Sequence, residues 1–139
     1  MKFEFLPDVA IADIAFRAEG KTLEALFANC AMALTETMAD PRKISGKVKK
    51  RIVADGMTEE EMLYKFLSEL VYIKDVDNLI FKKFDVKISK ENLIAECEGD
   101  SLLAIGRKNL RNDVKAITMH MFKVKKTAEG FEATVVVDI

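Results

Sequence analysis

The sequence predicts an α+β fold: a single domain over residues 1–139, with a mostly antiparallel β-sheet and two amphipathic helices. Apolar residues recur at every second position in most segments and at every third or fourth position in two, a pattern typical of strands mixed with two helices. Neighbouring strands dominate the second half, whereas a parallel sheet would alternate strands with helices. No Gly/Ser-rich linker divides the chain, and 139 residues suit one domain.

Two segments are predicted to be helical. The first follows Thr22, whose hydroxyl can cap it, and ends before Pro41, because proline disfavours the helical conformation in the residue before it. The second begins with a capping box, in which Thr58 precedes Glu61 by three residues. The apolar face of the first helix comprises Leu23, Leu26, Phe27, Cys30, Leu34 and Met38, and that of the second Met62, Leu63, Phe66, Leu67, Leu70 and Ile73.

The remaining apolar runs predict strands. Three lie at residues 2–6, 11–19 and 48–54. The second half adds a half-buried strand that ends before a turn at Asn92, its successor, and a pair at residues 114–126 and 131–139. The residues expected to share a face within these strands are Ile80, Phe84, Val86 and Ile88, then Leu93, Ala95 and Cys97, and finally Phe131, Ala133, Val135 and Val137.

The chain contains no familiar catalytic or nucleotide-binding motif: no GxGxxG, Walker A loop, HExxH, EF-hand loop or CxxC. His120 is the sole histidine, and it is either a half-buried imidazole with local hydrogen bonds or a functional group. Cys30 and Cys97 are expected to be small buried hydrophobic side chains rather than a disulfide. Strict alternation places His120 on one face with Val114, Ala116, Thr118, Phe122 and Val124.

Charge and hydropathy limit the classes of partner that the sequence allows. Twenty-two basic and twenty-three acidic residues leave a net charge of −1, so the surface as a whole is not built to hold nucleic-acid phosphates. The loop at residues 107–113 concentrates Arg107, Lys108 and Arg111, which could contact phosphates or an acidic protein surface. Acidic residues interrupt the N-terminal segment where a signal peptide needs an apolar core, and no apolar stretch is long enough for a membrane span. A cytoplasmic protein without membrane association is expected.

Two aspartates stand out among the acidic residues. Asp13 interrupts an otherwise apolar stretch, and a buried carboxylate needs a partner, a cation or water. Asp138 lies directly before the terminal carboxylate of Ile139, and adjacent anions repel each other unless a positive group or water intervenes. These three carboxylates would suit a hard cation such as Ca²⁺ or Mg²⁺. A frayed, solvated terminus is the alternative.

Four segments together resemble the archease family, in the family's order and over almost the whole chain. They are KFEFLPDVAIADIAFRAEGKTLEALFANCAMAL at residues 2–34, EEEMLYKFLSELVYIKDVDNLIFKKFDV at 59–86, VKAITMHMFKVKK at 114–126 and VVVDI at 135–139. Members of this family are small α+β proteins that act as cofactors of the RtcB-type tRNA-splicing RNA ligase. They promote loading of the ligase with guanylate and restore its turnover.

The resemblance implies roles for individual residues. Asp13, Asp138 and Ile139 match the family's cation-binding positions, where the cation is commonly assigned as calcium. Lys115 matches a functionally important lysine in the family's VKAITYH segment, although its position alone would suggest a solvated lysine at the start of a strand.

The chain departs from the family pattern in two places. The usual Pro-His-Thr-Ala-Asp is replaced by residues 7–13, which are longer by two residues and lack the histidine. Asp8 in this loop is either an extra oxygen ligand or an exposed side chain. Met119 stands where the family has a tyrosine before the motif histidine.

Three functions compete at this point. The first is a non-enzymatic activator that docks on the ligase with a bound divalent cation, Ca²⁺ or Mg²⁺, and meets tRNA only indirectly. The second is a tRNA-binding chaperone or modulator of a tRNA-processing or tRNA-modifying enzyme. The third is a metal-dependent hydrolase built on Asp8, Asp13 and Asp138, which the missing general base disfavours. No catalytic residue is assigned, and the first function is the favoured one.

Overall fold

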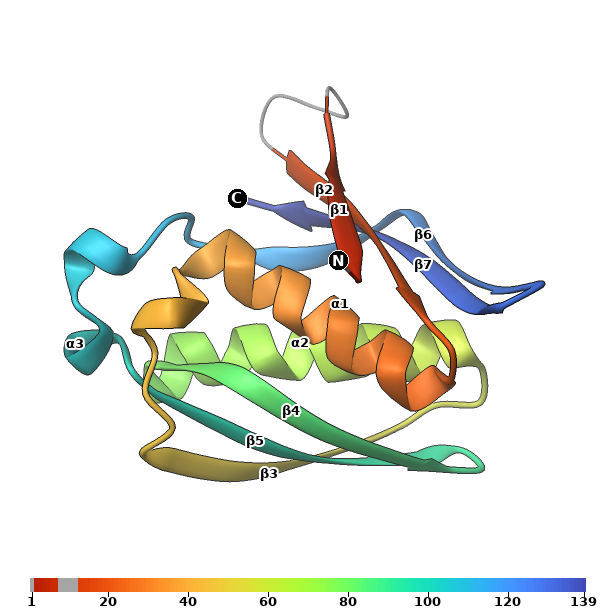
Figure 1. Cartoon of the computed structure of the whole chain (residues 1–139), viewed down its shortest axis with the longest axis horizontal. Helices are drawn as coiled ribbons and strands as arrows, with labels where there is room; N and C mark the ends of the chain where they lie inside the picture. The colour runs from red at the N-terminus through yellow and green to blue at the C-terminus, as the bar shows by residue number, and fades with distance from the viewer. Residues whose placement is uncertain (1, 8–12) are drawn as a thin grey trace.

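The computed structural model describes residues 2–7 and 13–139, which form two antiparallel sheets with two long helices between them (Figure 1). Helices α1 (Leu23–Met38) and α2 (Glu59–Asp77) pack against strands of both sheets. The predicted α+β class is confirmed. The first sheet has the order β1-β2-β7-β6, with strands Phe3–Leu6, Asp13–Gly20, Gly130–Asp138 and Ala116–Thr127. The second has the order β3-β5-β4, with strands Val48–Asp55, Asn92–Ser101 and Leu79–Ser89.

Local signals set the ends of both helices, and the start of each helix and the end of α1 are as predicted. The hydroxyl of Thr22 accepts a backbone N–H of the first turn of α1, and that of Thr58 does the same for α2, each at 3.1 Å. Helix α1 ends before Pro41, and α2 ends at Asp77 and is capped by Asn78, which takes a left-handed conformation with a φ of 56°. Among the described residues, no helix is long and apolar enough to cross a membrane.

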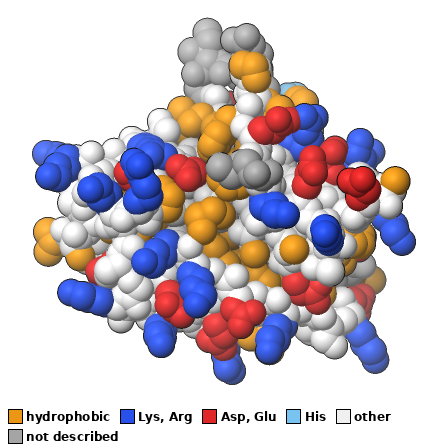
Figure 2. Space-filling model, in the orientation of Figure 1, with side chains coloured by type: hydrophobic (Ala, Val, Ile, Leu, Met, Phe, Trp, Pro, Cys, Tyr) orange, Lys and Arg blue, Asp and Glu red, His pale blue; other side chains and the backbone are white. Residues whose placement is uncertain are grey.

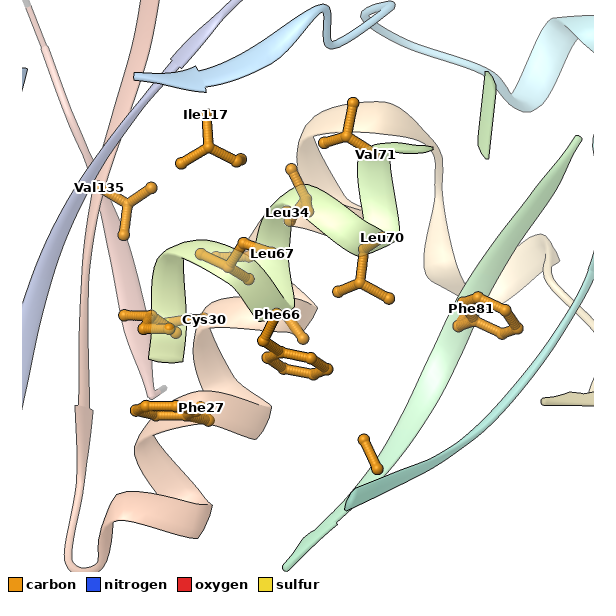
Figure 3. Packing of buried hydrophobic residues seen from close by; sticks show 14 of the residues in the cluster. Phe27, Cys30, Leu34, Phe66, Leu67, Leu70, Val71, Phe81, Ile117 and Val135 are labelled. Atoms are coloured by element: carbon orange, nitrogen blue, oxygen red, sulfur yellow. The ribbon is translucent and has the colours of Figure 1, made fainter. Parts of the chain in front are cut away.

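The core lies between the sheets, around the inner faces of the two helices (Figure 3). Phe27 of α1 and Phe66 of α2 stack with their ring centroids 6.4 Å apart. Cys30 and Cys97 are buried free thiols in this core, which confirms their predicted role. Ala133, Val135 and Val137 of β7 are all buried on the core face, as the alternation along that strand predicted.

Strand β6 departs from the predicted alternation. Its register with β7 shifts between Thr118, opposite Val136, and Lys123, opposite Thr134, so that residues 119–122 lie opposite a single residue. This bulge places Val124 on the core face and leaves His120 exposed. The prediction that His120 is half-buried on one face with Val124 is therefore wrong, because each inserted residue reverses the face of those that follow it.

Three short helical segments were not predicted. They are η1 (Pro41–Lys43), α3 (Leu102–Ile105) and η2 (Arg107–Asn109), all single turns. A segment of three or four residues is too short to show a helical period. The predicted loop at residues 107–113 therefore begins with a helical turn, and β6 starts at Ala116, two residues later than expected.

Candidate functional site

Asp13 and Asp138 lie directly opposite each other in the register of β2 and β7. The adjacent pair, Ile14 and Val137, packs with the core, so the two aspartates share the outer face of the sheet. Directly opposed residues have Cβ atoms about 4.5–5.5 Å apart. The fold therefore brings together the two aspartates that the sequence analysis singled out.

Lys115 joins the same corner through its backbone. Its N–H donates to the Asp138 carbonyl at 2.8 Å, and the next residue, Ala116, lies opposite Asp138 in the register of β6 and β7. The Lys115 side chain is exposed and lines an open groove of about 230 Å³ between α2 and β6, together with Tyr72 and Asp75. The backbone of Lys115 therefore lies beside that of Asp138, close to the pair of Asp13 and Asp138.

The end of β7 is held in place. Ile139 is half-buried and packs against the core, which argues against a frayed terminus. Its carboxylate follows Asp138 directly and is a further source of oxygen ligands. Asp8, the predicted extra ligand, lies outside the described residues.

The donors at this corner fit a hard cation. None of the ion pairs formed by the described residues includes Asp13 or Asp138. Like charges directly opposite each other destabilise an antiparallel strand pair, and carboxylate oxygens are ligands that Ca²⁺ and Mg²⁺ accept. Across residues 2–7 and 13–139, no three side chains of His, Cys, Asp or Glu gather to hold a metal ion. The terminal carboxylate of Ile139 would add a third anionic group to the two aspartates.

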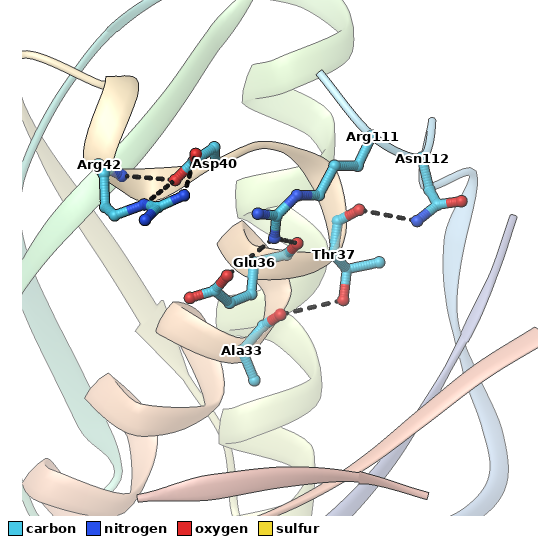
Figure 4. A network of polar contacts seen from close by, with 7 residues as sticks. All are labelled: Ala33, Glu36, Thr37, Asp40, Arg42, Arg111 and Asn112. Carbon is cyan, nitrogen blue, oxygen red and sulfur yellow. Dashed lines mark hydrogen bonds and ion pairs between the residues drawn. The ribbon is translucent and has the colours of Figure 1, made fainter. Parts of the chain in front are cut away.

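Polar contacts hold the segment before Lys115 against the end of α1 (Figure 4). The Arg111 guanidinium donates to the carboxylate and the backbone carbonyl of Glu36, each at 2.8 Å. The Asn112 amide donates to the carbonyl of Thr37 at 3.0 Å. Arg111, a candidate phosphate contact by sequence, anchors its own loop to α1 in the structure.

Sequence reasoning missed Lys74 of α2, the only charged residue that is buried in the described part of the chain. Its ammonium donates to Asp113 and to the carbonyl of Val114 and pairs with Asp75. Burial disfavours the ammonium, but the hydrogen bonds to the two aspartates outweigh burial, and the pKa of Lys74 lies above its usual value. Its position four residues after Leu70, on the apolar face of the helix, was the signal that could have revealed it.

The chain matches the model of the Archease protein family over residues 3–139. The protein archease of Methanosarcina mazei is 35% identical over 147 residues, which cover 99% of this chain and 96% of that relative. The one from Sulfurisphaera tokodaii is 34% identical over 139 residues, which cover 99% of each chain.

Solved structures agree with these relatives. Protein 1598 of Methanobacterium thermoautotrophicum, a solution structure, has a TM-score of 0.84 at 30% identity, with 99% of both chains covered. A structure from Thermotoga maritima, described as an archease and possible chaperone, shares the fold with a TM-score of 0.66 at 19% identity and 96% of both chains covered. From the family match and the curated relatives, the chain belongs to the archease family.

Proposed function

We propose that this protein activates an RtcB-type tRNA-splicing RNA ligase, promoting its guanylation and turnover without performing the ligation itself. The observation that carries the proposal is the meeting of Asp13, Asp138 and Lys115 at one corner of the first sheet. These are the positions to which the family resemblance assigns function, and they come from three separate segments of the chain.

The chemistry of the corner suits an accessory role. Asp13, Asp138 and the Ile139 carboxylate would hold a divalent cation, Ca²⁺ or Mg²⁺, which would neutralise the opposed carboxylates and stiffen the end of β7. The exposed Lys115 side chain presents a positive charge in the neighbouring groove between α2 and β6. Contacts made better with one state of the ligase than with another would shift the ligase toward its guanylation-competent state.

A multiple-turnover ligation assay tests the proposal. Substoichiometric amounts of this protein should raise the turnover and the guanylation of the RtcB-type ligase from the same organism, and the protein alone should neither ligate RNA nor consume GTP. An unchanged ligation rate across a range of protein and GTP concentrations would overturn the proposal. Nucleotide turnover by the protein alone would instead favour the metal-dependent hydrolase.

Lys115→Ala makes the assay specific to the site. The variant should lose most of the stimulation, while its free energy of unfolding should change by no more than about 0.5 kcal/mol, as for most exposed positions. Lys126→Ala is the matched control, because Lys126 is also exposed, lies at the far end of β6 and has no ion pair among the described residues. If both variants lose stimulation equally, Lys115 has no special role.

One observation favours the second candidate function, a tRNA-binding chaperone. The Asp40 N–H donates to the Asn109 carbonyl at 2.9 Å, which joins η1 to η2 at the end of the molecule that carries α3. Lys and Arg side chains gather over this end in Figure 2. The exposed cations of the two turns are Arg42, Lys43, Arg107 and Lys108.

Salt dependence separates this second candidate from the first. A surface that holds phosphates releases counterions, so tRNA affinity should fall steeply with salt and should weaken further in Arg107→Glu/Lys108→Glu. Salt-sensitive binding of tRNA by the protein alone, together with no effect on the ligase, would make the chaperone the better function.

A further inference from the structure

We infer that Lys74 is a positioning residue: its buried ammonium sets where the chain enters β6 and thereby where Lys115 lies relative to the Asp13–Asp138 pair. The inference deepens the proposed function and rests on it. Lys74 belongs to α2, outside every segment that forms the corner itself.

The contacts of Lys74 fill its capacity for hydrogen bonds. Its Nζ lies 2.5 Å from Asp113 Oδ1, 2.6 Å from Asp75 Oδ1 and 2.7 Å from the Val114 carbonyl oxygen. An ammonium group has three hydrogens to donate, and here three acceptors surround it. The residue is only 5% exposed, so the ammonium has little access to water as an alternative partner.

Two of these acceptors belong to the segment that leads into the corner. Residues 111–115 lie in no helix or strand. The backbone N–H groups of Arg111 and Asn112 bond to carbonyls of α1, so between these bonds and that of Lys115 the path of residues 113–114 depends on side-chain contacts. Arg111 and Asn112 fasten the start of this segment to α1, and Lys74 fastens Asp113 and Val114 to α2. Lys74 is therefore the last polar side-chain anchor before Lys115, and it acts together with the buried side chain of Val114.

The next link is the backbone of Lys115 itself. Its N–H donates to the Asp138 carbonyl, and Asp138 lies opposite Asp13. A shift of Asp113 and Val114 would thus move Lys115 relative to the aspartates. Asp75, the partner of Lys74 within α2, also lines the groove beside β6, so the Lys74 network borders the surface that Lys115 presents.

Stability alone gives a weak reason for a buried ammonium. An apolar side chain of similar length often serves a core equally well, because desolvation of a charge offsets much of what the pairing contributes. Lys74→Met therefore offers a test that keeps side-chain length and removes the charge. Lys65→Met is the matched control on the same helix, because Lys65 pairs with Asp55 and Glu61 in an exposed setting.

The first readout is ligase stimulation in a double-mutant cycle. Lys74→Met should lower stimulation at least about tenfold, since a misplacement of about 1 Å can cost a reactive arrangement on the order of 10²-fold. Lys65→Met should not lower it, and Lys74→Arg, which keeps the charge, should retain part of it. In a Lys115→Ala background, Lys74→Met should have less than about a twofold further effect, whereas independent effects would multiply. Multiplying losses would overturn the inference.

The second readout needs no ligase: amide hydrogen exchange of two backbone groups. In Lys74→Met, exchange of the Lys115 N–H should accelerate, whereas that of the Asn112 N–H, which donates to Thr37 of α1 at 3.1 Å, should stay as in the wild type. Unchanged protection of Lys115 would overturn the inference. If the wild type fails to stimulate the ligase, the proposed function fails while the exchange data still decide whether Lys74 positions Lys115.

Asp113→Asn covers the case in which Lys74→Met does not fold. The Asp113 side chain is 80% exposed, so the substitution leaves the core intact while it weakens the hold on the segment. It should shift both readouts in the same direction as Lys74→Met and by a smaller factor. Wild-type exchange of Lys115 in Asp113→Asn would count against the inference as well.

Discussion

The thiols of Cys30 and Cys97 lie in the apolar core, where a thiolate would lose its hydration. Burial raises the pKa of both thiols, and for Cys97 burial and the nearby charge of Glu96 raise the pKa to about 12 from an ordinary 9.0. A raised pKa means that the folded state prefers the neutral thiol. This contribution to stability is complete below pH 9.0 and is lost as the pH rises toward about 12.

Both thiols should therefore stay unreactive toward an aromatic disulfide reagent at about pH 8 in the native protein and react once it is unfolded. The free energy of unfolding, from denaturant titrations, should fall as the pH rises above 9.0, and less steeply in Cys97→Ala. Rapid labelling of the native protein would show that the core opens more readily than its packing implies.

At the scale of one element, α2 joins two features that matter to the site. Its N-cap at Thr58 closes the first turn, and Lys74 in its last turn holds the segment that leads to Lys115. Glu61 also accepts from the N–H of Met57 at 3.0 Å, one residue before the cap. Because Thr58 and Lys74 lie at opposite ends of α2, losing the cap should fray the first turn without disturbing the contacts of Lys74.

Thr58→Ala should cost about 1 kcal/mol of stability, because the Glu61 N–H loses its acceptor at the helix start. Urea unfolding monitored by circular dichroism measures the loss, and Thr58→Ser, which keeps the hydroxyl, should unfold close to the wild type. Ligase stimulation should be unchanged in both. Equal midpoints for wild type and Thr58→Ala would mean that tertiary packing holds the first turn without the cap.

At the scale of the whole molecule, the site exists because β7 lies between β2 and β6. Without a divalent cation, Asp13→Asn should be more stable than wild type by about 0.2–1 kcal/mol, since it removes one of two opposed like charges. At about 100 times the dissociation constant, Ca²⁺ should stabilise wild type by about 2.7 kcal/mol and Asp13→Asn by less. Thermal unfolding with and without Ca²⁺ or Mg²⁺ measures both effects.

Asp85→Asn is the matched control for this experiment. Asp85 also lies opposite a carboxylate, that of Glu96, but Arg51 already pairs with Glu96 at 2.6 Å. Its response to the cation should equal that of the wild type.

A neutral Gly-Ser tail after Ile139 tests the third ligand, because it turns the carboxylate into a weaker peptide carbonyl. Equal calorimetric affinity in wild type, Asp13→Asn and the tailed protein would exclude the corner as the cation site.

Much of the secondary structure could be predicted because its causes are local. Each of these causes acts only on residues a few positions away in the chain. They are the capping hydroxyls of Thr22 and Thr58, the proline at position 41 and the two-residue period of β7. The bulge of β6 could not be predicted in this way. It depends on how residues 119–122 pair with the neighbouring strand β7, and the hydrophobic period of β6 alone carries no information about that pairing.

The candidate site divides along the same line. Asp13 and Asp138 could be chosen from the sequence, because a carboxylate in an apolar run and another beside a chain end are anomalies that can be seen in one dimension. Their distance across the sheet depends on the pairing of β2 with β7, and Lys74 acquires its role only when α2 packs beside residues 113–114. The sequence shows which charged groups lie in apolar runs and are therefore costly to bury. Long-range strand register and helix packing determine which of these groups meet.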